Sequence, residues 1–176
     1  ELMDAYSHGK LRMEEYMEFS LEPLIGRTPE EVEHLVGPWV EDFIEPIIFS
    51  DATKTIAAHR KAGDRILVIS ASGTHLVKPI ADRLGIDEIL GIELEVAHGV
   101  YSGHTVGTLT YREGKITRLL EWLEREGETL DGAYFYSDSR NDLPLLLKVD
   151  HPQVVNPDPV LREHAEKAGW PIHHWI

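Results

Sequence analysis

The sequence contains no cysteine, which excludes disulfide bonds, thiol nucleophiles and cysteine-ligated zinc sites. It also has no apolar run approaching the roughly 20 residues that span a bilayer, so we expect no membrane-spanning helix. Basic residues are scarce: 17 Lys and Arg stand against 31 Asp and Glu, and the formal net charge is -14. A surface of this sign repels nucleic acid and acidic membranes at long range. These absences predict a cytoplasmic protein that binds neither nucleic acid nor membranes.

The first residues lack a basic start, an apolar segment and an initiator methionine. They resemble neither a signal peptide nor the natural beginning of a protein. We therefore expect the 176 residues to belong to a longer polypeptide. A chain of this length buries roughly 70% of its unfolded surface, which is enough for one domain or a domain with a small cap.

The first fifty residues have the apolar spacing of helices. Apolar side chains recur at near-helical intervals over residues 11–24, and the glycine and proline of residues 26–29 interrupt them. A second helix is predicted to start at Pro29, because Thr28 is a suitable N-cap and Glu31 completes a capping box. Together the two segments predict a helical hairpin.

From residue 51 onward, predicted helices alternate with short apolar strands. The strands are expected at residues 65–70, 86–96, 133–136 and 153–155, with a hairpin turn at 99–103, and the helices at 52–61, 74–84, 115–126, 141–148 and 159–168. This alternation is typical of an α/β fold with a doubly wound parallel sheet. Such sheets bind ligands at the carboxyl ends of their strands, so we expect the functional residues there.

The first such strand end has the residues of an anion site. Ser70, Ala71 and Ser72 follow an apolar strand and precede Gly73, so hydroxyl and backbone N–H groups can converge on a phosphate at a helix start. The alternative is that Ser70 and Thr74 simply cap the next helix.

The second strand end carries oxygen ligands. Asp138 follows the strand directly, and Asn141 and Asp142 lie about one helical turn further on, a set that suits Mg²⁺. The alternative is that these side chains cap a helix. Between the two strand ends, Lys115 opens a helix, where the helix dipole disfavours a cation. An anionic partner explains its position, and a solvated surface lysine is the alternative.

In combination these segments resemble the haloacid dehalogenase superfamily, in the branch similar to phosphoserine phosphatases. The resemblance rests on residues 68–72, on residues 113–115 and on residues 136–145, and it covers nearly the whole chain in order and spacing. It implies that Ser70, Ala71 and Lys115 bind the transferring phosphoryl group, with Ser70 and Lys115 in catalytic roles. It further implies that Asp138 holds Mg²⁺ and that Asn141 and Asp142 support that site.

One family motif is absent. The resemblance implies a first strand ending in Asp-x-Asp-x-Thr that supplies the nucleophile, and no Asp-x-Asp occurs in the sequence. We expect that strand in a segment outside this chain, which as given is inactive. The domain prediction is therefore a partial helical cap at residues 1–50 and a core at residues 51–176 that lacks its first strand.

The function implied is hydrolysis of a small-molecule phosphomonoester through an aspartyl-phosphate intermediate. Residues 19–25 carry Glu22 and no Lys or Arg, so an amino-alcohol phosphate such as histidinol phosphate fits the cap better than phosphoserine does. A solvent-facing Glu22 without such a role is the alternative. A phosphotransferase with the same mechanism and an inactive binding protein on the same fold stay open as other functions.

Overall fold

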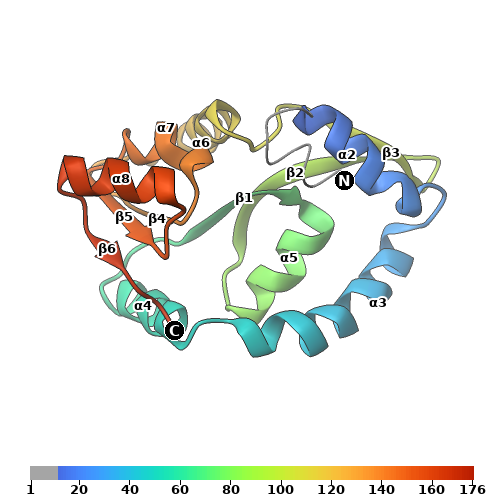
Figure 1. Cartoon of the computed structure of the whole chain (residues 1–176). Coiled ribbons are helices and arrows are strands. Elements are labelled where there is room, and N and C mark those ends of the chain that lie inside the picture. The colour runs from blue at the N-terminus through green and yellow to red at the C-terminus, as the bar shows by residue number, and fades with distance from the viewer. Residues whose placement is uncertain (1–11) are drawn as a thin grey trace.

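The structure is a computed structural model that describes residues 12–176, and its strands form two separate sheets (Figure 1). In the first sheet, β1 (Leu67–Gly73) pairs in parallel with β2 (Glu88–Ala97), which pairs antiparallel with β3 (Val100–Val106). In the second sheet, β4 (Tyr134–Ser137), β5 (His151–Val155) and β6 (Ile172–His173) are parallel. The parallel pairs confirm the predicted α/β class, and the β2–β3 hairpin adds an antiparallel strand to the first sheet.

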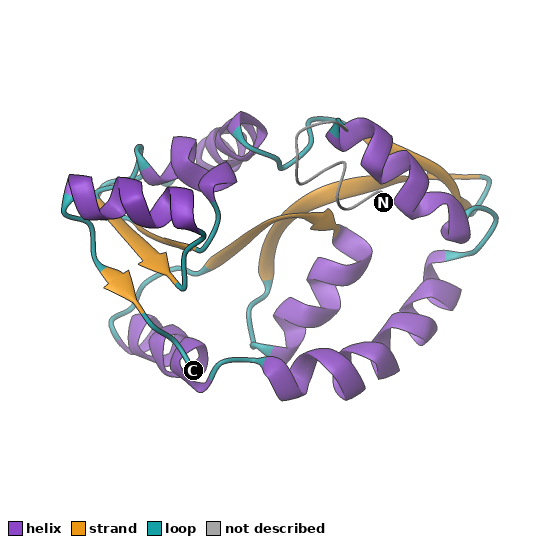
Figure 2. Cartoon of the chain, in the orientation of Figure 1, coloured by secondary structure: helices purple, strands orange, loops and turns teal. Residues whose placement is uncertain are grey.

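Helices surround both sheets and connect the parallel strands (Figure 2). α5 crosses from β1 to β2 and α8 from β5 to β6, as parallel pairing requires. No helix of residues 12–176 is long and apolar enough to cross a membrane. The helical segments in chain order are α2 (Met13–Leu21), η1 (Glu22–Leu24), α3 (Pro29–Trp39), η2 (Val40–Ile44), η3 (Glu45–Ile47), α4 (Ser50–Lys61), α5 (Thr74–Arg83), α6 (Glu113–Glu126), η4 (Arg140–Asp142), α7 (Leu143–Leu146) and α8 (Pro159–Ala168).

Local sequence signals fix the ends of several helices. Thr28 accepts the Glu31 backbone N–H at 3.1 Å, which confirms the predicted start of α3. Asp158 does the same for α8, where it accepts the Leu161 N–H at 2.8 Å. α8 then ends at Gly169, whose positive φ of 72° suits a residue without a side chain.

Two apolar clusters hold the helices against the first sheet. α6 packs Leu119, Trp122 and Leu123 against Leu90 of β2. α2 packs its Met13, Met17 and Leu21 side chains against Ile92 of the same strand. Fully burying one such side chain stabilises the fold by roughly 1.5–3 kcal/mol. β2 therefore supplies the buried side chains against which both α2 and α6 pack.

The structure differs from the sequence predictions in four segments. The first helix ends at Leu21 rather than residue 24, where a short 3₁₀ turn follows, and Leu11 lies outside the described residues. The hairpin turn is centred on His98 and Gly99, both with positive φ, so the rest of the predicted turn at 99–103 lies in β3. The helix predicted at 141–148 is a 3₁₀ turn followed by α7, which has four residues. The short apolar sequence of β1 is typical of a strand buried on both faces, yet Leu67 and its neighbours are only half-buried because, within residues 12–176, one edge of β1 is unpaired.

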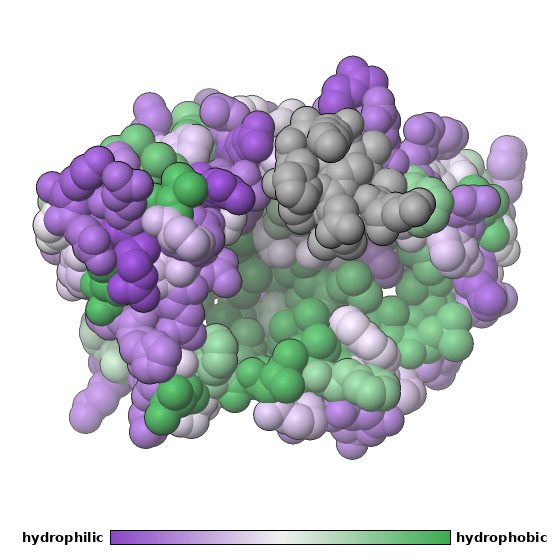
Figure 3. Space-filling view, viewed as in Figure 1, coloured by the Kyte–Doolittle hydropathy of each residue, from purple (hydrophilic) through white to green (hydrophobic). Residues whose placement is uncertain are grey.

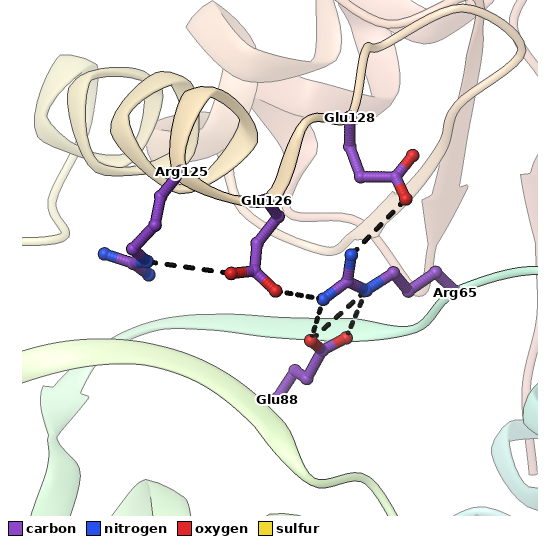
Figure 4. Close-up of polar contacts among 5 residues, drawn as sticks. All are labelled: Arg65, Glu88, Arg125, Glu126 and Glu128. Atoms are coloured by element: carbon purple, nitrogen blue, oxygen red, sulfur yellow. Dashed lines mark hydrogen bonds and ion pairs between the residues drawn. The ribbon is translucent and has the colours of Figure 1, made fainter.

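Arg65 ties the amino ends of β1 and β2 to the end of α6 (Figure 4). Its guanidinium donates to Glu88 at 2.9 Å, to Glu126, and to Glu128 at 3.3 Å. The hydrogen bonds from Arg65 hold the pKa of Glu88 below its ordinary value. These ion pairs lie at the amino ends of the strands, whereas the predicted functional residues lie toward the carboxyl ends.

Candidate active site

The structure brings the two predicted strand ends to one edge of the fold. In the second half of β1, the Ser70 carbonyl oxygen accepts a hydrogen bond from the buried Thr110 hydroxyl. After β4, the Asn141 side-chain oxygen accepts from Arg112 Nε at 3.4 Å. Since Thr110 and Arg112 belong to one short segment, that segment spans the distance between the carboxyl ends of β1 and β4.

Lys115 and Asp142 form a buried ion pair at this edge. Lys115 Nζ lies 2.7 Å from Asp142 Oδ1, and the two side chains are 9% and 10% exposed. The other carboxylate oxygen of Asp142 accepts from the Ser137 hydroxyl at 2.5 Å. Lys115 is therefore not the solvated surface lysine that sequence reasoning left open, because a carboxylate and the protein interior enclose its ammonium group.

Backbone constraints aim the Lys115 side chain inward. Arg112, immediately before α6, has a positive φ of 51°, and Gly114 stands in the first turn of the helix. A Cβ at Gly114 would lie 1.9 Å from the Leu109 carbonyl oxygen, so only glycine fits there. The resulting close approach starts α6 with Lys115 directed at Asp142.

Asp138 lies beside this ion pair. Its carboxylate is partly exposed, and partial burial raises its pKa, as do the nearby negative charges of Asp142 and Asp158. Lys115 acts in the opposite direction. The Asp138 backbone is fixed, because its carbonyl oxygen accepts the Asp158 N–H at 3.0 Å. A partly exposed carboxylate with other carboxylates nearby suits a bound cation.

The described residues supply only part of a metal site. Residues 12–176 contain no group of three or more His, Asp or Glu side chains placed to hold a metal ion. Asp138 fits one position in the ligand set of Mg²⁺, which prefers carboxylate oxygens and water.

The last residues of β1 depart from regular strand pairing. The register with β2 shifts between Ile69 and Gly73, and the Ser70 hydroxyl accepts the Ser72 N–H at 3.3 Å just before α5 begins. Ala71 packs against the cluster of α2 methionines, so α2 lies against this strand end. Just beyond it, the buried Nδ1 of His75 has no hydrogen-bond partner within residues 12–176, and burial lowers the pKa of this imidazole.

Glu22 is not brought into this cluster by any contact that the structure describes. It is exposed at the start of η1, and its side chain makes no hydrogen bond or ion pair within residues 12–176. Asn141 does reach the site, through its contact with Arg112.

Sequence reasoning missed three residues that build the site. Thr110 gave no sequence signal, because an isolated threonine in a loop is common. Ser137 stands directly before Asp138, yet its role depends on a contact with Asp142 that only the fold reveals. Asp158 caps α8 and also accepts the Arg140 N–H at 2.7 Å, and so fixes the loop after β4.

Comparisons with known proteins agree on one family. The haloacid dehalogenase-like hydrolase family matches residues 2–147. A histidinol-phosphatase of Neisseria meningitidis is 40% identical over 171 residues, which are 95% of this chain and 77% of that protein. A phosphoserine phosphatase of Mycobacterium tuberculosis is 33% identical over 147 residues, which are 84% of this chain and 48% of that protein. A crystal structure of a Bordetella pertussis protein of unknown function has a TM-score of 0.91 at 36% identity, and covers 97% of this chain and 78% of that one. The chain thus spans about half of the mycobacterial protein and somewhat over three quarters of the other two.

Proposed function

This chain belongs to the haloacid dehalogenase-like hydrolase family, in its phosphoserine-phosphatase-like branch, and from that membership we propose that its polypeptide hydrolyses a small phosphomonoester at the edge where Ser70, Lys115 and Asp138 gather. The enzyme class, a phosphatase, follows from the family. The roles of individual residues, the metal and the substrate are our proposal, as is the division into a cap at residues 1–50 and a core at residues 51–176. The cytoplasm remains the compartment that the lack of cysteine favours.

The buried Lys115–Asp142 pair carries the proposal. Phosphoryl transfer spreads negative charge over three oxygens in the transition state, and catalysis depends on fixed positive charge near them. An ammonium group has three N–H donors, and Asp142 engages one side of it. Lys115 is therefore held in place while it keeps donors for phosphoryl oxygens.

Ser70 and Ala71 are proposed to bind the same phosphoryl group from the β1 side. The Ser70 carbonyl is fixed by Thr110, so its hydroxyl stays at the strand end. The Ala71 backbone N–H follows directly and adds a neutral donor. Hydrogen-bond donors that are in place before the reaction need no reorganisation when charge develops.

Asp138 is proposed to hold Mg²⁺, with Asn141 and Asp142 supporting it. When bound, Mg²⁺ neutralises phosphoryl charge and orients the ester for in-line attack. The surplus of carboxylates over cations around Asp138 supports this assignment, because these charges repel one another without a cation.

The nucleophile is proposed to be an aspartate in a segment outside this chain. It would attack phosphorus in line, expel the alcohol, and form an aspartyl-phosphate that water then hydrolyses. The same intermediate passed to an alcohol makes a phosphotransferase, and product analysis with added acceptor alcohols distinguishes the two reactions.

The substrate class is proposed from the cap. The chain carries a net charge of -14 and has no cation at residues 19–25, so a substrate with a second anionic group is poorly matched there. An amino-alcohol phosphate carries an ammonium group instead, which the negative charge of Glu22 and of the chain as a whole attracts. The histidinol-phosphatase name of the Neisseria relative supports this class, and the mycobacterial relative keeps phosphoserine as the second candidate.

The test is phosphate release by the full-length polypeptide from a panel that includes histidinol phosphate and phosphoserine, with Mg²⁺ or with EDTA. We expect EDTA-sensitive turnover that Lys115→Met reduces by roughly 10²-fold or more, the range seen when a charge-stabilising donor is removed. Lys167→Met is the matched control, because that lysine is 76% exposed on α8. Turnover that survives both EDTA and Lys115→Met would overturn the assignment.

A further inference from the structure

Arg112 is a cation at the candidate active site that has no ion-pair partner among residues 12–176. Its Nε donates to the side-chain oxygen of Asn141 at 3.4 Å, and its guanidinium carbon lies 5.0 Å from the centre of the Tyr111 ring. Neither neighbour is a carboxylate. The side chain is exposed, and its Nη1 and Nη2 groups make no hydrogen bond within the described part of the chain.

The carboxylates of this edge already have other partners. Asp142 directs one oxygen at Lys115 and accepts the Ser137 hydroxyl with the other. Both oxygens of Asp158 accept backbone N–H groups, at 2.7 Å and 2.8 Å. Asp138 is the remaining carboxylate, and it has the proposed metal position. The guanidinium of Arg112 therefore keeps its outer donors, although several acids lie around it.

The backbone of Arg112 is strained, which indicates a role other than stability. Its φ of 51° and ψ of -122° lie in a region that glycine adopts readily and other residues adopt rarely. The residue also stands directly before α6, where the helix dipole disfavours a cation. Both features are unfavourable for the folded chain without a ligand. Strained residues of this kind cluster at functional sites.

Arg112 and Lys115 connect the same two segments of the chain. Arg112 contacts Asn141, and Lys115 pairs with Asp142, so both cations at the start of α6 meet the segment that follows β4. Lys115 is enclosed, with 9% of its side chain exposed, whereas Arg112 lies at the surface. An anion that binds Lys115 can thus be reached by the guanidinium from the solvent side.

The surroundings of these contacts are polar. Figure 3 shows mostly hydrophilic side chains over α7 and α8, whereas apolar side chains gather in the hollow at the centre of the same face. α7 begins two residues after Asn141, on the hydrophilic side. A charged ligand is therefore better matched beside Asn141 than in the hollow.

We propose that Arg112 is a phosphate-binding residue, which takes the phosphoryl group of the ester from solvent and shares its charge with Lys115. This inference rests on the proposed function, because it needs a phosphoryl ligand at the same edge. A guanidinium binds phosphate oxygens through two parallel N–H groups, and Arg112 leaves its Nη1 and Nη2 donors for them. Asn141 holds Nε and so orients the guanidinium. The second cation also offsets the repulsion between the phosphate and the surrounding carboxylates.

The test measures the affinity of the full-length polypeptide for inorganic phosphate by isothermal titration calorimetry in the presence of Mg²⁺. This affinity does not depend on turnover. We expect Arg112→Gln to weaken phosphate binding roughly 10- to 150-fold, the range for a lost hydrogen bond to a charged group. Arg112→Lys should lose less, because it keeps the charge without the paired donors. Arg125→Gln is the matched control and should bind phosphate as the unaltered chain does, because Arg125 is 64% exposed at the other end of α6.

Arg112→Gly distinguishes a binding role from a structural one. Glycine relieves the backbone strain at a φ of 51°, so this variant should raise Tm and yet weaken phosphate binding as much as Arg112→Gln does. If the contact with Asn141 served only the fold, the same substitution would lower Tm and leave the affinity for phosphate unchanged.

The remaining outcomes are equally decisive. The proposal is wrong if the unaltered polypeptide does not bind phosphate, or if Arg112→Gln and Arg112→Gly bind it as tightly as the control does. It is also wrong if the variants lose only esters with a second anionic group, such as phosphoserine, because Arg112 would then bind the leaving group. Phosphate binding that depends on Arg112 in a polypeptide that hydrolyses no ester would support the binding role and refute the proposed function. Ester hydrolysis with Mg²⁺ and full phosphate affinity in Arg112→Gln would support the proposed function and refute this inference.

Discussion

Replacing Asp142 with asparagine tests whether the centre of the site is a desolvated ion pair. The substitution keeps the shape of the side chain and leaves the Lys115 ammonium without its carboxylate at 2.7 Å. Both side chains are about one-tenth exposed, and breaking a buried pair by removing one partner costs about 3–5 kcal/mol. For a chain of this size, that loss lowers Tm by roughly 6–20 °C.

The assay is urea unfolding of Asp142→Asn, of Lys115→Met and of the double variant, which together form a double-mutant cycle. We expect the double variant to regain stability relative to Asp142→Asn, because it no longer buries an unpaired charge. The matched control is the exposed Lys167–Glu163 pair on α8, where Glu163→Gln should cost about 0.3–0.5 kcal/mol. If Asp142→Asn costs no more than this control, the Lys115 ammonium is solvated and our reading of the site is wrong.

Three further substitutions test other features of the site. Asp138→Asn should raise Tm in EDTA, because it removes a partly buried charge beside other carboxylates, and a lower Tm would contradict the repulsion inferred there. Gly114→Ala should cost about 1–3 kcal/mol in urea unfolding, owing to the 1.9 Å approach to Leu109, whereas Gly37→Ala, with open space in α3, should stabilise the chain. Burial lowers the pKa of His75 in the folded state below the ordinary value of 6.5. As the pH falls through 6.5, the imidazole of the unfolded chain is therefore protonated first, and the folded state loses stability. His75→Phe should retain that stability between about pH 7 and pH 5.5, which unfolding free energies at the two values will check.

Local signals in the sequence were sufficient for most helices. α8 was predicted at its observed bounds, because Pro159 and Gly169 mark its start and stop. The start of α3 at Thr28 followed in the same way. Such signals act over one turn of chain, so sequence reasoning can detect them without knowledge of the fold.

The contacts within the site could not be predicted in this way. Thr110 and Ser70 are 40 positions apart, and no periodicity connects them. The pairing of Lys115 with Asp142 depends on how α6 packs against the segment after β4, which is a property of the tertiary structure. The partial burial of β1 could not be predicted from the sequence either, because it depends on which strands pair with β1 rather than on the residues of β1 themselves.

The carboxylates around Lys115 affect the order in which ligands bind. Asp138, Asp142 and Asp158 outnumber the two cations near them, which are the Lys115 ammonium and the Arg112 guanidinium that contacts Asn141, so the local charge is negative before any ligand arrives. A phosphate dianion approaching this edge meets net repulsion, whereas a divalent cation is attracted. We therefore expect an ordered kinetic scheme in which the cation binds first and the ester second. Raising the ester concentration should then tighten the apparent affinity for Mg²⁺, because the ester binds only the form that already holds the cation.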